Sequence, residues 1–213
     1  MSGLPVILSL LLFLTGCSSP GSPPTRFFLL TAQATQEGDG QSSIGRKAGL
    51  VVELEPVEIP QYLNRPEMVT RAGGNRLRLE RMNQWAGDFK EDIGRVTMEN
   101  LARLLHSERV SLLPARGESV PDFRIATTIH RFEPDESGQV SLEARWTLFD
   151  GRGAQLETRH ARITTRAERA EDYESMAKAM SQALGQLAQE MGEEIQVRSK
   201  GKKGRGLSRP ENR

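Results

Sequence analysis

The sequence predicts an α+β fold: a single domain in which two helices pack on one face of an antiparallel or mixed β-sheet. Three observations lead to this prediction. The expected elements follow one another as strands, helix, strands and helix, an order typical of α+β domains. Residues 139–149 alternate apolar and polar side chains as a half-buried strand does. Residues 171–195 repeat apolar side chains at helical spacing.

The first half of this domain is predicted to hold strands and one hairpin. The expected strands are 27–30, 49–59, 68–71 and 76–81, with a polar loop over 33–47 and the hairpin turn at 72–75. Glu53 and Glu55 should lie on the outer face of a half-buried strand, because they alternate with apolar residues. In the hairpin, Leu77 and Leu79 should face inward.

The second half begins with a predicted helix over 88–107, which Asp88 can cap. Strands are expected at 110–113, 122–132, 139–149 and 154–165, followed by a long helix over 171–195. The methionines of that last helix either form a soft binding surface or pack on the sheet. From residue 197 onward, Lys and Arg lie among Gly and Ser, and this composition predicts a disordered tail.

A lipid attachment site is predicted ahead of the domain. Leu14-Thr15-Gly16-Cys17 follows a short apolar run, ends on the only cysteine of the chain and resembles the lipobox of bacterial lipoproteins. The run of about 11 apolar residues is too short to span a bilayer, which needs roughly 20. The resemblance implies cleavage before Cys17, acylation of that residue, and export to the outer membrane directed by Ser18. An ordinary signal peptide with an incidental cysteine is the alternative.

The expected organisation of the chain has four parts. They are a lipoprotein signal peptide (1–16), the lipidated cysteine and a Pro-rich linker (17–26), the α+β domain (27–196) and a disordered basic tail (197–213). No Lys or Arg precedes the apolar run, which departs from the usual signal peptide. The formal net charge is only +1, so nothing in the overall charge favours a nucleic-acid partner.

The most informative internal stretch runs from Pro60 to Arg71 and contains Pro-x-Tyr-Leu-x-Arg followed by Val-x-Arg. With Phe28-Leu29-Leu30 before it and Asn83-x-Trp85 after it, this stretch is similar to the auxiliary lipoprotein of ABC-type transport systems, the PqiC/YmbA-like family. The resemblance covers the chain after processing, apart from the basic tail. Ala86-Gly87-Asp88 stands where the family tends to carry a proline, which bears on how the next helix begins.

Five residues of this motif are candidates for binding a partner: Tyr62, Leu63, Arg65, Arg71 and Trp85. Tyr, Trp and Arg supply much of the energy of protein interfaces, and Arg offers fork-shaped donors. In the alternative interpretation, Arg65 and Arg71 pair with acidic groups of the same domain, namely Glu53, Glu55 or Glu67. Tyr62 would then close the sheet edge, and Trp85 would be a packing residue.

The sequence indicates no catalytic, metal-binding or cofactor-binding residues. His106, His130 and His160 lack the spacing of metal ligands, and no cysteine lies near them. Neither a Gly-x-Ser-x-Gly motif nor a phosphate-binding glycine loop occurs. Asp135 and Glu136 are expected in a turn and not in a catalytic pair. We therefore expect a protein that is not an enzyme.

The family resemblance implies a subunit of an intermembrane lipid-transport system. Its expected partner is a periplasm-spanning protein with MCE domains, and its expected place is the outer membrane, lipid-anchored and facing the periplasm. There it would act as a non-catalytic docking module. A lipid carrier that holds an acyl chain between sheet and helices, and a structural envelope lipoprotein, are the alternatives. The sequence leaves the oligomeric state open, including a homo-oligomer.

Overall fold

The computed structural model describes residues 24–33, 49–113 and 120–205, with side chains up to residue 201. The signal peptide, Cys17, most of the linker, the predicted loop beyond residue 33 and residues 206–213 lie outside this part. The described elements, in chain order, are β1 Arg26–Phe28, β2 Val52–Leu54, β3 Glu67–Arg71, β4 Leu77–Trp85, α2 Phe89–Leu104, β5 Val110–Leu112, β6 Phe123–Pro134, β7 Gln139–Asp150, β8 Gln155–Arg166 and α3 Tyr173–Arg205.

The strands form two sheets. The larger one has the order β5-β2-β6-β7-β8, in which β2 runs parallel to both neighbours and β6, β7 and β8 form an antiparallel meander. The smaller one has the order β1-β4-β3, with β1 parallel and β3 antiparallel to β4. A single parallel bridge between Arg71 and Asp135 connects β3 with the end of β6. Both sheets are therefore mixed, as the fold class predicted.

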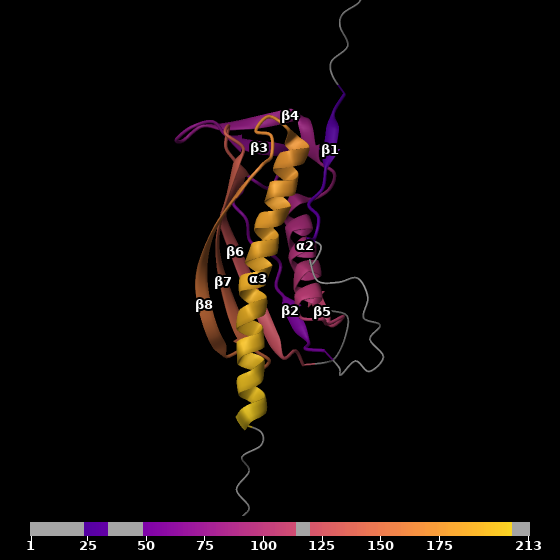
Figure 1. Ribbon diagram of the computed structural model, residues 1–213, viewed down its shortest axis with the longest axis vertical. Helices are drawn as coiled ribbons and strands as arrows, with labels where there is room; N and C mark the ends of the chain where they lie inside the picture. Colours follow the sequence, from indigo (N-terminus) through magenta and orange to yellow (C-terminus); the bar gives the residue numbers. More distant parts are fainter. Residues whose placement is uncertain (1–23, 34–48, 114–119, 206–213) are drawn as a thin grey trace, which may run out of the picture.

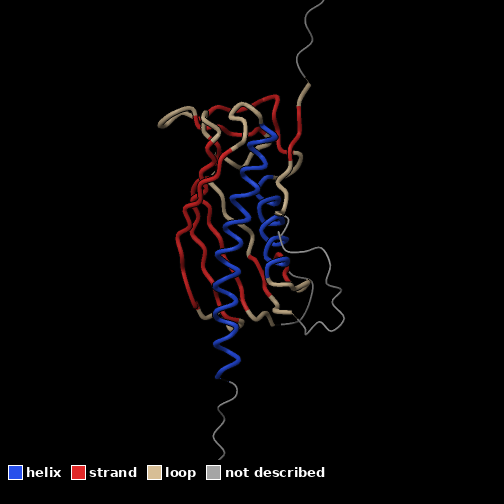
Figure 2. Tube along the Cα trace, viewed as in Figure 1, coloured by secondary structure: helices blue, strands red, loops and turns tan. Residues whose placement is uncertain are grey.

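The two helices lie side by side against the larger sheet, and the smaller sheet closes one end of the molecule (Figures 1 and 2). Helix α2 begins where predicted, since the side chain of Asp88 accepts a hydrogen bond of 2.9 Å from the backbone N–H of Glu91. Its predicted apolar stripe, from Phe89 through Ile93 and Val96 to Leu101, is buried. The α+β prediction is confirmed, with two sheets where one was expected.

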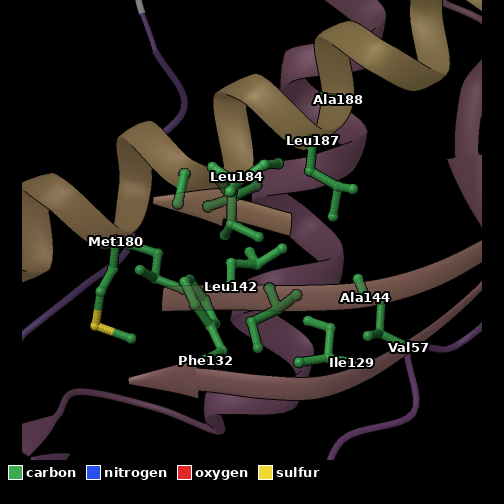
Figure 3. Close-up of a cluster of buried hydrophobic side chains, with 14 of the residues drawn as sticks. Val57, Ile129, Phe132, Leu142, Ala144, Met180, Leu184, Leu187 and Ala188 are labelled. Atoms are coloured by element: carbon green, nitrogen blue, oxygen red, sulfur yellow. The ribbon is translucent and has the colours of Figure 1, made fainter. Parts of the chain in front are cut away.

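The main core lies between α3 and the meander. Figure 3 shows Met180, Leu184, Leu187 and Ala188 of the helix pointing toward Phe132, Leu142 and Ala144 of the strands. The methionines at positions 176, 180 and 191 are at most 2% exposed. They pack against the sheet, so the alternative of a soft methionine surface on this helix is wrong.

Helix α3 is longer than the sequence pattern predicted. It continues beyond Ile195 to Arg205, so the predicted disorder is wrong for residues 197–205. Arg198 explains part of this extension, because it donates hydrogen bonds to Glu194 one turn earlier, at 2.6 Å, and to Glu157 of β8, at 2.9 Å. The second contact comes from a strand 41 residues away, and composition alone does not reveal it.

Two side chains of the predicted strands differ in exposure from the prediction. Glu53 alternates with Val52 and Leu54 as expected but is buried, because all three residues of β2 are buried inside the mixed sheet. Its carboxylate pairs with Arg124 at 3.3 Å. Leu79 was expected to face inward but is 40% exposed. Its neighbourhood on β4 is an open sheet edge, which is described below.

Candidate functional site

The motif from Pro60 to Arg71 lies at the junction of the two sheets. After β2 the chain makes a tight turn, in which the N–H of Leu63 donates to the carbonyl of Pro60 at 3.0 Å. Glu58, just before the turn, bridges Thr128 of β6, and Arg71, at the end of β3, bridges Asp135. The motif is therefore fixed to the larger sheet at both ends.

Glu133 of β6 is the centre of this junction. Its side chain is 0% exposed, and both of its carboxylate oxygens accept hydrogen bonds from the motif. Arg71 donates to Oε1 from Nε at 2.7 Å, with its Nη2 at 2.6 Å from the same oxygen, and Tyr62 donates its hydroxyl to Oε2 at 2.9 Å. Arg131 adds a third donor, with its Nε 3.0 Å from Oε1. We call Glu133, Tyr62, Arg71 and Arg131 the Glu133 cluster.

The charges in the Glu133 cluster stabilise the protonation states that these contacts need. Burial and the neighbouring carboxylate raise the pKa of Tyr62 above its ordinary value, so the hydroxyl stays protonated and donates. Burial disfavours the charged form of Arg71, but its hydrogen bond and ion pair with Glu133 outweigh that effect and raise its pKa. The buried carboxylate is thus compensated by two guanidinium groups and one hydroxyl.

The five predicted binding residues separate into three groups. Tyr62 and Arg71 pair internally, as the alternative interpretation proposed, but with Glu133 and not with Glu53, Glu55 or Glu67. Arg65 pairs with Glu67 at 3.2 Å, and both side chains remain partly exposed at 34% and 25%. The remaining two, Leu63 and Trp85, are buried core residues.

Trp85 connects the smaller sheet to the helix layer and the larger sheet. Its ring stacks on Phe89 of α2 with centroids 4.5 Å apart, and Phe89 stacks on Phe132 of β6 at 5.8 Å. Phe132 immediately precedes Glu133 in the chain. The aromatic stack and the Glu133 cluster therefore hold the same junction, one through apolar contacts and the other through charge.

Sequence reasoning missed Glu133 and Arg131. Its partners Tyr62 and Arg71, which the sequence had suggested as binding residues, lie 71 and 62 residues away from Glu133 in the chain. A bulge in β6 between Ile129 and Arg131 also interrupts the strand alternation just before the cluster. Because of this bulge the core face passes from Ile129 to Phe132, so Glu133 lies on the other face and no local pattern in the sequence marked it as buried.

A cavity of about 560 Å³ opens beside the first turns of α2. Its apolar lining comes from Pro56 and Val57 after β2 and from Leu112 and Leu113 around β5. Its charged lining comes from the helix: Asp88, Lys90, Glu91, Asp92 and Arg95. The volume is within the range of small-molecule sites, and the lining is mainly apolar with charged groups on one side.

The described residues contain no group of three or more His, Cys, Asp or Glu side chains placed to hold a metal ion. Neither described helix carries an apolar stretch long enough to cross a bilayer.

Comparison with known proteins places these features in a family. A family model described as the ABC-type transport auxiliary lipoprotein component matches residues 28–192. No curated protein sequence matches the chain. A solved structure of an uncharacterized protein is 17% identical, with a TM-score of 0.66 over 81% of this chain and 99% of the other.

A second solved structure, of a Xanthomonas campestris protein from the family DUF330, is 14% identical, also with a TM-score of 0.66. The match covers 84% of this chain and 99% of that one. At these identities the two structures are similar to this chain in fold alone. The family model spans the Glu133 cluster, the aromatic stack, all of α2 and the part of α3 up to residue 192.

Proposed function

The chain belongs to the family of ABC-type transport auxiliary lipoprotein components, and from this premise we propose that it is a non-catalytic docking subunit of an intermembrane lipid-transport system. In this proposal Cys17 carries acyl chains that anchor the protein in the outer membrane, with the domain in the periplasm. Its partner is a periplasm-spanning protein with MCE domains. The domain receives the tip of that protein at the outer membrane.

One observation carries the proposal: the family match runs from residue 28 to 192 and so includes nearly every described element of the domain. The assignment therefore concerns the whole folded unit and not a short motif within it. The lipobox at Leu14–Cys17 precedes this unit, as a lipoprotein requires. Several acyl chains on one residue give stable anchoring, whereas a single chain gives only marginal, reversible binding.

Within the predicted binding motif, Arg65 is the residue best placed to contact a partner. It is charged and partly exposed, and its ion pair is with a partly exposed glutamate, Glu67, two residues away. Tyr62 and Arg71 support it indirectly, because the Glu133 cluster fixes the backbone on either side of Arg65. We therefore propose Arg65 as the contact, with Tyr62, Arg71, Leu63 and Trp85 holding the surface in shape.

The test is co-purification of the lipidated chain with its MCE-domain protein, followed by affinity measurements on purified variants. Arg65→Ala should weaken binding by about 1–4 kcal/mol, the range of interface hot spots, while leaving the melting temperature nearly unchanged. Arg162→Ala is the matched control, because Arg162 is exposed on β8, away from the motif. Equal affinities for the two variants would remove Arg65 from the interface. Failure of any MCE-domain protein to co-purify would reject the docking function itself.

The cavity beside α2 favours a second candidate function, that of a lipid carrier. Its apolar lining and its volume of about 560 Å³ suit an acyl chain, and Lys90 could hold an anionic headgroup. Gly87 lines the cavity, and a Cβ added there would meet no heavy atom within 4 Å, so Gly87→Trp should fill the space without a backbone clash. Gly74→Trp, on the β3–β4 hairpin, is the control, since Gly74 is equally open.

The carrier function predicts a phospholipid in the purified protein, detected by native mass spectrometry. Gly87→Trp should abolish the bound lipid, whereas Gly74→Trp should retain it. Absence of lipid from the wild-type protein, extracted gently from membranes, would reject this candidate and leave docking as the proposed function.

A further inference from the structure

Strands β1 and β4 expose a mixture of arginine and large apolar side chains that the junction does not use. The exposed residues of the two strands are Arg26, Phe27, Arg78, Leu79, Arg81 and Met82, which we call the basic edge. Phe27 is 63% exposed, and Leu79 and Met82 are 40% and 39% exposed. No acidic residue is among the exposed positions of these two fully described strands.

Part of β4 in the basic edge lacks a neighbouring strand on one side. Strand β3 pairs with residues 77–80 and 84 of β4, whereas β1 pairs with β4 only at residues 83–85. In the described part of the chain, residues 77–82 therefore form an open edge on the β1 side. Side chains on both faces of β4 reach solvent there, which explains why arginine and apolar residues are exposed together.

The stretch of sequence that contains most of the basic edge is positively charged. Residues 60–87 contain five arginines and two glutamates, hence a formal charge of +3, whereas the whole chain carries +1. Both glutamates are already paired, Glu67 with Arg65 and Glu80 with Arg78. Arg81 is exposed and forms no ion pair with another described residue. Residues 60–87, which include β3 and β4, therefore carry a net positive charge of their own.

The basic edge also lies at the end of the molecule closest in sequence to the lipid attachment site. Figure 1 shows β1, β3 and β4 at one end, and the C-terminal part of α3 at the other. Cys17 precedes the first described residue, Pro24, by seven residues, which span at most about 25 Å. An acylated Cys17 therefore keeps this end, and not the α3 end, near the bilayer.

We propose that the basic edge lies on the surface of the anionic bilayer in which Cys17 is anchored, with Phe27, Leu79 and Met82 in the interfacial layer and the arginines on lipid phosphates. The inference rests on the lipid anchor of the proposed function. Arginine beside exposed aromatic and aliphatic groups is the composition of interfacial membrane contacts. Each arginine at an anionic surface favours the contact about fivefold. Tethering raises the effective concentration of the surface, so weak contacts suffice.

An alternative explanation is that arginine only protects an open strand from pairing with another chain. That explanation accounts for the charges but not for three exposed apolar side chains beside them. A membrane surface accounts for both. It also agrees with the proposed contact at Arg65, since a partner that reaches the outer membrane would meet the domain at its membrane-facing end.

A fluorescent label at Phe27→Cys in the full lipidated chain tests the proposal. Cys17 is the only cysteine and is blocked by its acyl chains, so the introduced thiol is labelled alone. Val197→Cys is the matched control, because Val197 is also 63% exposed but lies near the far end of α3. Both proteins are reconstituted in vesicles of phosphatidylethanolamine and phosphatidylglycerol, with or without brominated acyl chains. Unchanged melting temperatures show that both variants are folded.

The expected result is blue-shifted emission at position 27, quenched by brominated lipid, with neither effect at position 197. Arg81→Gln should lower the ratio of membrane-contacting to free label about fivefold, whereas Arg162→Gln on β8 should leave it unchanged. A label at position 27 that stays in water, in protein that floats with the vesicles, overturns this inference and leaves the anchor intact. A blue shift without bromine quenching assigns the edge to a protein neighbour and also overturns it. Loss of flotation rejects the anchor and this inference with it.

Discussion

Removing Arg71 should destabilise the domain strongly, because its guanidinium compensates a fully buried carboxylate. Glu133 is 0% exposed, and Arg71 makes its two shortest contacts, at 2.6 and 2.7 Å. In Arg71→Ala, the carboxylate keeps only Arg131 at 3.0 Å, Tyr62 at 2.9 Å and the backbone N–H of Phe132 at 3.1 Å. Arg131 is then the only guanidinium next to the Glu133 carboxylate, whereas the native protein has both Arg71 and Arg131 there.

The size of the expected loss in unfolding free energy follows from the burial of the Arg71–Glu133 ion pair. Breaking a buried ion pair on one side costs about 3–5 kcal/mol, because the remaining charge is left without its partner. Since Arg131 and Tyr62 remain in place, we expect the lower end, about 3 kcal/mol. For a domain of this size, 1 kcal/mol corresponds to about 2–4 °C, so the melting temperature should fall by about 6–12 °C.

The assay is urea and thermal unfolding followed by circular dichroism, with Arg65→Ala as the matched control. Arg65 belongs to the same motif and also pairs with a glutamate, but that pair is partly exposed. Its loss should cost about 0–1 kcal/mol. The double variant Arg71→Ala with Glu133→Gln should recover part of the lost stability, because it removes the charge that Arg71 compensated.

Two results would refute this reasoning. The first is a melting temperature for Arg71→Ala within about 2 °C of that for Arg65→Ala, which would mean that the Glu133 cluster contributes no more than a surface pair. The second is a double variant no more stable than Arg71→Ala, which would mean that the buried carboxylate does not need compensation. If the cluster is structural, Arg71→Ala should lower partner binding only as far as it lowers the folded fraction.

Three further predictions concern the anchor and one turn. Cys17→Ala should leave an unlipidated precursor without stable outer-membrane attachment, checked by palmitate labelling and fractionation. Identical behaviour of wild type and variant would contradict it. Ser18→Asp should hold the protein at the inner membrane of a Gram-negative host, and unchanged flotation on a sucrose gradient would show that position 18 does not decide sorting. Burial disfavours ionised Asp135, but hydrogen bonds from Ser137 and Gln139 outweigh it and lower its pKa below the ordinary value of 3.8. Its stabilisation should therefore be present above pH 4 and lost as pH falls through the folded pKa, so the difference in urea stability between wild type and Asp135→Asn should shrink below pH 4.

Much of the fold was predictable because its signals are local. The stripe of α2 and the buried face of α3 repeat at helical spacing, and Val140, Leu142, Ala144, Trp146 and Leu148 of β7 alternate and are all buried. Asp88 was identified as the cap of α2 from its position alone, and its hydrogen bond confirms the prediction. The family resemblance also depended on a contiguous motif, and the family match confirms it.

The candidate site was predictable only in part. The sequence identified Tyr62 and Arg71 as unusual and offered internal pairing as one explanation, but it could not name their partner. The predicted pairing of Arg65 with Glu67 is confirmed, and the two residues lie only two positions apart, at the start of β3. The partner-binding role of Arg65 stays a prediction.

The sequence by itself therefore determined what short-range periodicity and contiguous motifs encode: the order of elements, their apolar faces and the family. The tertiary structure decided whatever depends on a neighbour far along the chain. In the folded chain Glu53 is buried and Leu79 lies on an open sheet edge. The extension of α3 contacts Glu157 through Arg198, and Tyr62 and Arg71 both donate to Glu133. The physical reason is that burial and charge compensation are properties of a position in space. A side chain reveals them only once the strands beside it are known.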